Sequence, residues 1–165
     1  MRLILMRHAE PESGAAVATD ADRRLTEAGH DTARRIGGAL RKMGIHVDRV
    51  YTSPLIRARQ TAEDVAEGLG CDEAVEESDA LGFGFSVYRV LELLQDAGEK
   101  STVLCVGHAP DMNRLAASCI DREGMARLVF KKAAFCGIEF VGKPEAGAGV
   151  LQYLFRPNML LKLLD

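Results

Sequence analysis

The sequence lacks any uninterrupted apolar stretch near the roughly 20 residues that a membrane-spanning helix needs. Its N-terminal apolar run is broken by Arg7, His8 and Glu10, too early for a secretory signal peptide. An excess of basic residues is missing too: the formal net charge is −3, whereas a nucleic-acid-binding surface is normally strongly basic. We therefore expect a cytoplasmic protein that binds neither membranes nor nucleic acid.

Closely paired cysteines, which would indicate a metal site, are also missing among the four that the chain has. Cys105 and Cys119 lie in apolar patterns and are interpreted as small core residues. With 165 residues, 47% of them hydrophobic, the chain is long enough for one buried core. We expect a single domain over residues 1–165 and a monomer.

Two uninterrupted apolar runs each lead into a histidine. Arg2–Met6 runs directly into Arg7 and His8, and Thr102–Val106 is followed closely by His108. Apolar runs without alternation are typical of strands buried on both faces of a parallel sheet, where ligands bind beyond the carboxyl ends of the strands. If the two strands are neighbours, the two histidines and the arginine converge on one cleft. That combination predicts an anion site, and the anion we expect is a phosphoryl group.

The remaining pattern predicts helices alternating with short strands. A helix should begin after Thr26 as N-cap, carry a core stripe that includes Met43, and stop at Gly44. Ser53 and Pro54 form an N-cap and first-turn pair for a second helix that ends at Gly70. Further helices are expected over 86–97 and 110–120, and short strands over 47–53 and 74–77.

The C-terminal part should add an antiparallel pair of strands, over 127–142 and 149–156, at an edge of the sheet. The apolar tail over 159–164 should dock on the body or on a partner. The loop from Glu10 to Arg24 is long for a slack connection and is expected to be functional. His30 and His46 are interpreted as a solvated surface residue and a loop residue.

Arg57 stands in the opening turns of the second predicted helix. The helix dipole disfavours a cation at this end by about 0.3–1 kcal/mol. The position becomes favourable if an anion binds there as well, because helix N-termini attract phosphate. We therefore assign Arg57 to the anion site and interpret Arg59 as its solvated neighbour.

Four blocks of the sequence together resemble the histidine phosphatase superfamily, which has the phosphoglycerate-mutase-like fold. They are Arg7-His8, Leu25–Gly29, Ser53–Ala62 and Gly107-His108, and they follow the family order over most of the chain. The short length, and the lack of a large insertion before the last block, resemble the SixA-type phosphohistidine phosphatases. The resemblance implies a three-layer α/β fold, with a mostly parallel central sheet flanked by helices and an antiparallel C-terminal edge.

The resemblance also implies roles for the site residues. His8 would be the nucleophile and become transiently phosphorylated, which requires an unprotonated ring nitrogen that faces the phosphorus. Arg7 and Arg57 would hold the phosphoryl oxygens, and a cationic His108 would bind and stabilise the charge of the transition state. No metal or cofactor is implied, because the arginines supply the positive charge.

The sequence departs from the family pattern in two places. Ala9 stands where the family usually has glycine, and the family's carboxylic general acid has no clear counterpart, although Asp79 is a candidate. A missing acid favours protein phosphohistidine as substrate, because an imidazole can leave without a proton from the enzyme. The alternatives are a broad phosphatase of small phosphate esters and a non-catalytic phospho-binding module; a mutase fits less well.

Overall fold

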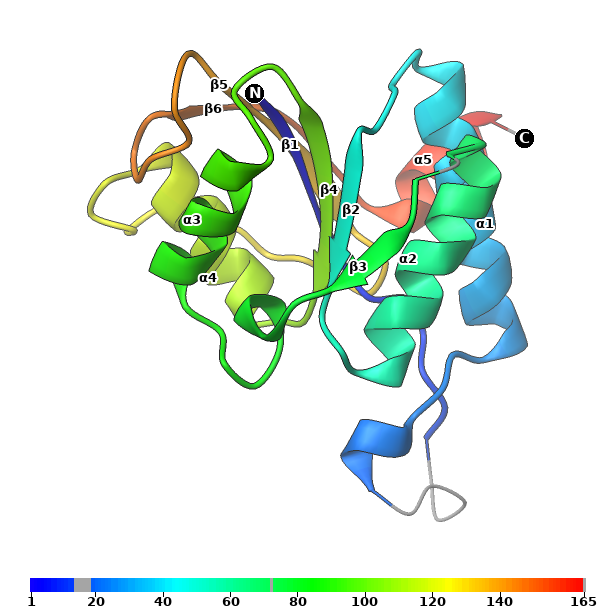
Figure 1. Cartoon of the computed structure of the whole chain (residues 1–165). Helices are drawn as coiled ribbons and strands as arrows, with labels where there is room; N and C mark the ends of the chain where they lie inside the picture. Colours follow the sequence, from blue (N-terminus) through cyan, green and yellow to red (C-terminus); the bar gives the residue numbers. More distant parts are fainter. Residues whose placement is uncertain (14–18, 72, 165) are drawn as a thin grey trace.

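The computed structural model describes residues 1–13, 19–71 and 73–164 (Figure 1). Within these residues six strands form one sheet in the order β3-β2-β4-β1-β5-β6. The strands are β1 (Arg2–Arg7), β2 (Arg49–Thr52), β3 (Val75–Glu77), β4 (Thr102–Gly107), β5 (Phe135–Phe140) and β6 (Gly149–Phe155). The helices are α1 (Glu27–Lys42), α2 (Ile56–Leu69), α3 (Val87–Asp96), α4 (Asp111–Ile120) and α5 (Pro157–Leu164), with 3-10 turns η1 (Asp20–Asp22) and η2 (Asp79–Leu81).

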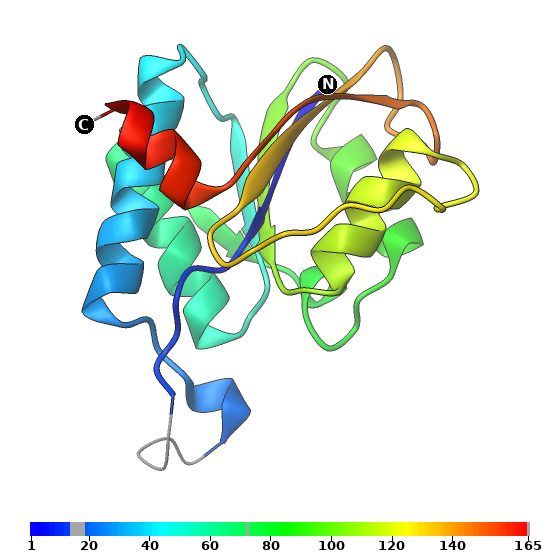
Figure 2. The same cartoon turned by 180° about the vertical axis from the view of Figure 1, so that it is seen from behind.

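Helices cover both faces of the sheet. Helices α1, α2 and α5 lie on one face and α3 and α4 on the other, as Figure 1 and Figure 2 show from opposite sides. Strands β3, β2, β4 and β1 are parallel, whereas β5 and β6 add an antiparallel edge. The expected three-layer α/β fold with an antiparallel C-terminal edge is confirmed.

The unbroken apolar run of β1 follows from burial on both faces. Ile4 and Met6 pack in the core with α1 and α2, whereas Leu3 and Leu5 pack in the core with α3 and α4. All four side chains are fully buried, which stabilises the fold by about 1.5–3 kcal/mol for each. β4 is buried in the same way, so both histidine-bearing strands lie in the middle of the sheet.

Helices α1 and α2 pack with their backbones close together. A Cβ atom at Gly37 would collide with the carbonyl oxygen of Val65, whereas one at the neighbouring Gly38 would meet open space. The same approach brings His30 of α1 to Asp64 of α2, with 2.6 Å between Nδ1 and Oδ2. The interpretation of His30 as a solvated surface residue is therefore wrong, because it ties the two helices together.

The helix α1 begins as predicted, with the hydroxyl of its N-cap Thr26 accepting a hydrogen bond from the Gly29 amide. It also stops at Gly44 as predicted, where φ is 71°, but the C-cap Met43 is 42% exposed and does not extend the core stripe. His46 is exposed between α1 and β2, as expected of a loop residue.

The strand predicted over 127–142 is wrong in its first half, because β5 begins only at Phe135. The preceding segment uses its backbone groups elsewhere: the Phe130 carbonyl accepts from Arg7, and the Ala133 amide donates to the carbonyl of His8. Ala133 has a φ of 56°, a left-handed conformation that a strand does not contain. The segment therefore wraps the end of β1 instead of pairing in the sheet.

The apolar tail forms α5 and docks on the body of the protein. Leu160 and Leu161 are buried in the same core as α1, whereas Met159 and Leu163 remain exposed. No helix in the described part of the chain is long and apolar enough to cross a bilayer.

Candidate active site

The register between β1 and β4 brings the two predicted histidines together. Arg7 pairs with Gly107, and the His8 amide donates to the Gly107 carbonyl at 2.9 Å, so His8 and His108 leave the sheet side by side. Their ring centroids are 5.2 Å apart. The expected convergence of the two strand ends is confirmed.

His8 is held in a form that can act as a nucleophile. Its side chain is only 6% exposed, and Nδ1 lies 2.7 Å from the carbonyl oxygen of Ala9. A carbonyl oxygen only accepts, so Nδ1 carries the proton and Nε2 keeps its lone pair. Burial is the main cause that lowers the pKa of His8 to about 3, with smaller contributions from His108, Arg57 and Arg7. The imidazole is therefore neutral at pH 7.

Ala9, the residue after His8, is hydrogen-bonded to a residue of the Ser53–Ala62 block. The Ala9 amide donates to the hydroxyl of Thr61, which itself donates to the carbonyl of Arg57. Ala133 is the one non-glycine residue with positive φ in the described chain, so Ala9 adopts a conformation that alanine tolerates. Alanine in place of the family's glycine therefore does not disturb this backbone.

Arg57 lies at the start of α2 and is only 7% exposed. One guanidinium nitrogen donates to the Asp20 carbonyl at 2.6 Å, and the other lies 2.9 Å from Oδ2 of the same residue. Asp20 belongs to the long loop after β1, so this loop reaches the site; residues 14–18 of the loop, including Gly14, lie outside the described residues. The hydrogen bond from Arg23, together with Arg57, lowers the pKa of Asp20, so Asp20 is ionised and is a poor proton donor.

Arg7 is half-buried at the end of β1. Its Nη1 donates to the Phe130 carbonyl at 2.9 Å, which fixes the guanidinium beside His8. Its buried Nε has no hydrogen-bond partner among the described residues. Arg7 and Arg57 thus place two guanidinium groups around one imidazole, an arrangement that suits a phosphoryl group.

His108 lies beside His8 and is partly buried. Burial, followed by the charge of Arg57, lowers the pKa of His108 to about 4, so the ring is neutral at pH 7 in the free protein. Its Nε2 lies 2.8 Å from the hydroxyl of Ser53, and its buried Nδ1 has no partner in the described chain. Burial beside fixed cations disfavours a further positive charge in the free protein, so the cationic form that the resemblance implies for the transition state stays a prediction.

Ser53 also departs from its predicted role. Helix α2 begins at Ile56 with Leu55 as N-cap, so Ser53 does not cap it in the predicted way. Its hydroxyl accepts a hydrogen bond from the Leu55 amide at 3.3 Å, just before the helix, and it also contacts His108, which makes Ser53 a member of the site that the sequence prediction missed. The signal was available, because Ser53 opens the block that carries the family resemblance.

The candidate acid Asp79 lies in η2 and is exposed. Glu76 and Glu77 form exposed ion pairs on β3, with 3.6 Å from Glu76 to Arg49 and 3.6 Å from Glu77 to Arg59. No carboxyl group in the described residues is hydrogen-bonded to either site histidine, and no cluster of metal-ligating side chains was found among them. The role of Asp79 therefore stays a prediction.

Comparisons with known proteins identify the family and relatives of this chain. The sequence model of the histidine phosphatase superfamily (branch 1) matches residues 3–82. An uncharacterized protein of Picosynechococcus sp. is 31% identical over 139 residues, which is 84% of each chain. Phosphohistidine phosphatase SixA of Escherichia coli K12 is 29% identical over 160 residues, covering 95% of this chain and 94% of that protein.

The solved structure of the protein histidine phosphatase SixA complexed with tungstate has a TM-score of 0.81 to this fold. The two are 26% identical, and the match covers 97% of this chain and 99% of the other. Fold and site together define a phosphatase of the histidine type. The chain belongs to the histidine phosphatase superfamily, and among its members it is similar to SixA over nearly its whole length.

Proposed function

We propose that this enzyme removes the phosphoryl group from phosphohistidine on proteins, through a phosphohistidine intermediate at His8. One observation carries the proposal. A neutral His8 with a free Nε2 lies among Arg7, Arg57 and His108, while no described carboxyl group is hydrogen-bonded to the histidines. The site is therefore rich in anion-binding groups and poor in proton donors.

In the first step, the Nε2 lone pair of His8 attacks phosphorus opposite the leaving imidazole. The new phosphorus–nitrogen bond forms as the bond to the substrate nitrogen breaks, and a leaving ring that already carries its other proton departs neutral. Arg7 and Arg57 bind the oxygens of the transferred group through charge-assisted hydrogen bonds. The negative charge of that group raises the pKa of His108, which favours its cationic form at this stage.

In the second step, water attacks phosphorus, the bond to His8 breaks, and inorganic phosphate leaves. The charge that Mg²⁺ neutralises in other phosphoryl-transfer enzymes is here neutralised by the two arginines and His108. Nδ1 of His8 keeps its proton through both steps, because the Ala9 carbonyl holds it. Nε2 is thereby regenerated as a nucleophile without a proton transfer at that atom.

The leaving group supports phosphohistidine over phosphate esters. An alkoxide leaves poorly without a general acid, which is typically worth a factor of 10²–10⁴, whereas an imidazole needs none. The similarity to SixA, whose name states phosphohistidine phosphatase activity, points the same way. A cytoplasmic location, where thiols stay reduced, suits the four cysteines, which are free.

The test compares turnover of a phosphohistidine protein, free phosphohistidine and a panel of phosphate esters. We expect the phosphohistidine protein to be hydrolysed with the highest kcat/KM, and His8→Ala to abolish all activity while remaining folded. Faster hydrolysis of esters, lost in Asp79→Asn, would instead establish the small-molecule phosphatase with Asp79 as its acid. Phosphate binding without turnover of any substrate would indicate a phospho-binding module.

A further inference from the structure

A cavity lies beside the candidate active site. Its volume is about 630 Å³, and Arg7, which precedes His8, lines it. The other walls come from Glu10 after β1, from Thr32 of α1, and from the segments before β5 and after β6. Met6 of β1 pairs with Phe135, the first residue of β5, and Phe135 pairs with Phe155, the last residue of β6. The cavity therefore opens at the same edge of the sheet as the two histidines.

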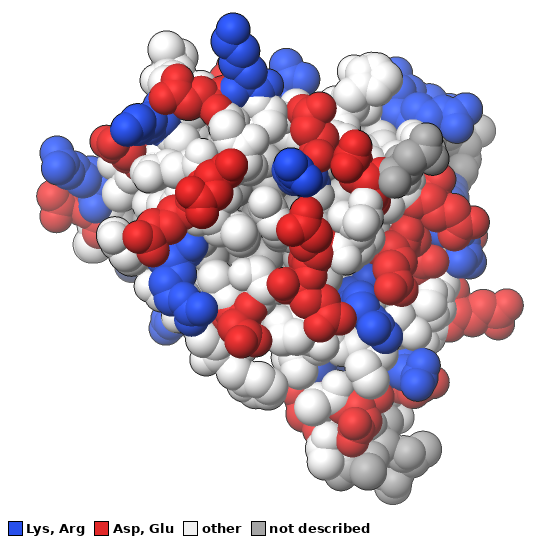
Figure 3. All heavy atoms as spheres, in the orientation of Figure 1, with Lys and Arg blue, Asp and Glu red and all other residues white. Residues whose placement is uncertain are grey.

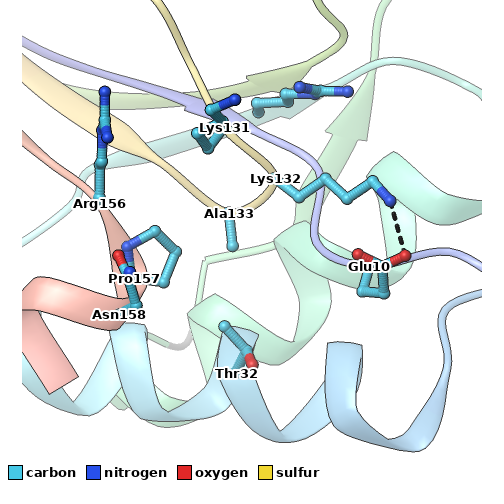
Figure 4. Close-up of a pocket in the computed structure, with 9 residues that line it drawn as sticks. Glu10, Thr32, Lys131, Lys132, Ala133, Arg156, Pro157 and Asn158 are labelled. Atoms are coloured by element: carbon cyan, nitrogen blue, oxygen red, sulfur yellow. Dashed lines mark hydrogen bonds and ion pairs between the residues drawn. The ribbon is translucent and has the colours of Figure 1, made fainter. Parts of the chain in front are cut away.

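Positive charge dominates this cavity, although the chain as a whole has a net charge of −3. Its lining contains Arg7, Lys131, Lys132 and Arg156 against a single carboxylate, that of Glu10 (Figure 4). Over the face of the molecule drawn in Figure 3, by contrast, acidic and basic side chains are interleaved. The cavity is thus a local concentration of cations.

Two of these cations lack an internal counter-ion. Glu10 is engaged by Lys132, with 2.6 Å between Oε1 and Nζ, the contact dashed in Figure 4. No ion pair or side-chain hydrogen bond joins Lys131 or Arg156 to another described residue. Both are exposed, so an anion that enters the cavity can reach them without displacing a protein group.

The backbone that carries these cations is fixed to the active site. The Ala133 amide donates to the His8 carbonyl at 3.0 Å, and the Ala134 amide donates to the Lys131 carbonyl at 2.9 Å. Ala133 holds a left-handed φ of 56°, a conformation that non-glycine residues rarely adopt. The tight turn that results sets both lysines at a fixed position relative to His8.

Arg156 is fixed from the other side. Its carbonyl accepts hydrogen bonds from Met159 and Leu160 at the start of α5. Burial of Leu160 and Leu161 against the core of α1 anchors that helix. The cavity is therefore a formed feature beside the active site.

The walls of the cavity decide what kind of ligand fits. Pockets that enclose small molecules are mostly apolar and bury most of the ligand, whereas Lys131, Lys132 and Arg156 are all exposed. The volume is also much larger than one phosphoryl group requires. Exposed cations around an open cavity suit carboxylates that project from the surface of another protein. Such carboxylates lose only part of their hydration when they bind there.

We propose that this cavity binds acidic side chains next to the phosphohistidine of a protein substrate. The inference rests on the proposed function, because the phosphoryl group occupies the site at His8 while flanking Asp or Glu residues contact Lys131 and Arg156. The cavity would raise affinity for acidic protein substrates and leave the chemical step unchanged.

The experiment uses two synthetic peptides phosphorylated on a single histidine, one flanked by Glu and the other by Gln. Lys131→Glu and Arg156→Glu are compared with the wild type, and Lys100→Glu serves as control because Lys100 is exposed beside the opposite end of β4. In the wild type we expect kcat/KM to favour the Glu peptide about tenfold, as two exposed ion pairs would give. The preference should disappear in both cavity variants and at high salt, while Lys100→Glu retains it.

Two controls separate this inference from the proposed function. The affinity for vanadate should be the same in wild type, Lys131→Glu and Arg156→Glu, because neither residue contacts the phosphoryl site. If the wild type hydrolyses esters but neither peptide, the proposed function fails. Fluorescence-anisotropy binding of the unphosphorylated peptides then decides the inference: equal binding of Glu and Gln peptides overturns it.

Two further outcomes would also overturn the inference. One is a preference for the Glu peptide that survives in both cavity variants. The other is a charge-dependent preference for small esters that carry a second anionic group, without any preference for the Glu peptide.

Discussion

Burial of His8 should make the folding of this enzyme sensitive to mild acid. Its pKa is lowered from 6.5 to about 3 in the folded protein, so the unfolded chain binds a proton first as the pH falls. Stability that is complete above pH 6.5 is then lost progressively as the pH falls towards 3. At pH 5, 1.5 units below the unfolded pKa, the loss from His8 alone is about 2 kcal/mol, at 1.36 kcal/mol per unit.

The assay is denaturant unfolding at pH 7.5 and pH 5 for wild type, His8→Gln and His46→Gln. His8→Gln removes the titrating group, so its free energy of unfolding should fall by about 2 kcal/mol less than that of the wild type over this interval. His46→Gln, which removes an exposed histidine, should follow the wild type. An identical pH dependence in wild type and His8→Gln would refute the burial argument and the neutral state of His8 that depends on it.

Three further predictions concern binding, chemistry and packing. Arg57→Ala should weaken vanadate binding roughly tenfold to a hundredfold by removing charge-assisted hydrogen bonds, whereas Arg59→Ala, on the exposed side of α2, should leave a calorimetric titration unchanged. Asp79→Asn should barely change phosphohistidine turnover; a rate loss above about a hundredfold would show that Asp79 is a general acid. Gly37→Ala should destabilise the fold by about 1–3 kcal/mol through its collision with α2, while Gly38→Ala should stabilise it by up to about 1 kcal/mol; equal effects on Tm would contradict the close packing of the two helices.

The two strands that carry the site histidines, β1 and β4, could be predicted because burial on both faces requires apolar side chains along each strand. Both faces of β1 and β4 are covered by helices, which produces apolar runs that are hard to mistake. The residues at their carboxyl ends then fall at the ligand-binding edge of the sheet. Arg57 could be singled out because a cation at a helix N-terminus is unfavourable without an anion, and in the structure the carboxylate of Asp20 lies beside it.

Contacts between distant segments could not be predicted from local pattern. The hydrogen bond between Ser53 and His108 joins residues 55 positions apart in the sequence, and that between Arg57 and Asp20 joins residues 37 positions apart. Neither contact produces a repeating pattern in the sequence. The neutral state of His108 has the same origin, because it depends on burial and on Arg57, which only the assembled site brings together. The strand prediction before Phe135 was wrong because it relied on local apolar content. In that segment the Ala133 amide is hydrogen-bonded to the carbonyl of His8 and not to a neighbouring strand.

The central claim, a phosphoryl group carried by Nε2 of His8, is tested most directly by trapping the intermediate. Wild type, His8→Ala and His108→Ala are mixed with a phosphohistidine donor, quenched under alkaline conditions that preserve phosphohistidine, and analysed by mass spectrometry with site mapping. We expect one phosphoryl group on His8 in the wild type, lost as phosphate is released, and none in His8→Ala. A label on another residue, or turnover by folded His8→Ala, would contradict it.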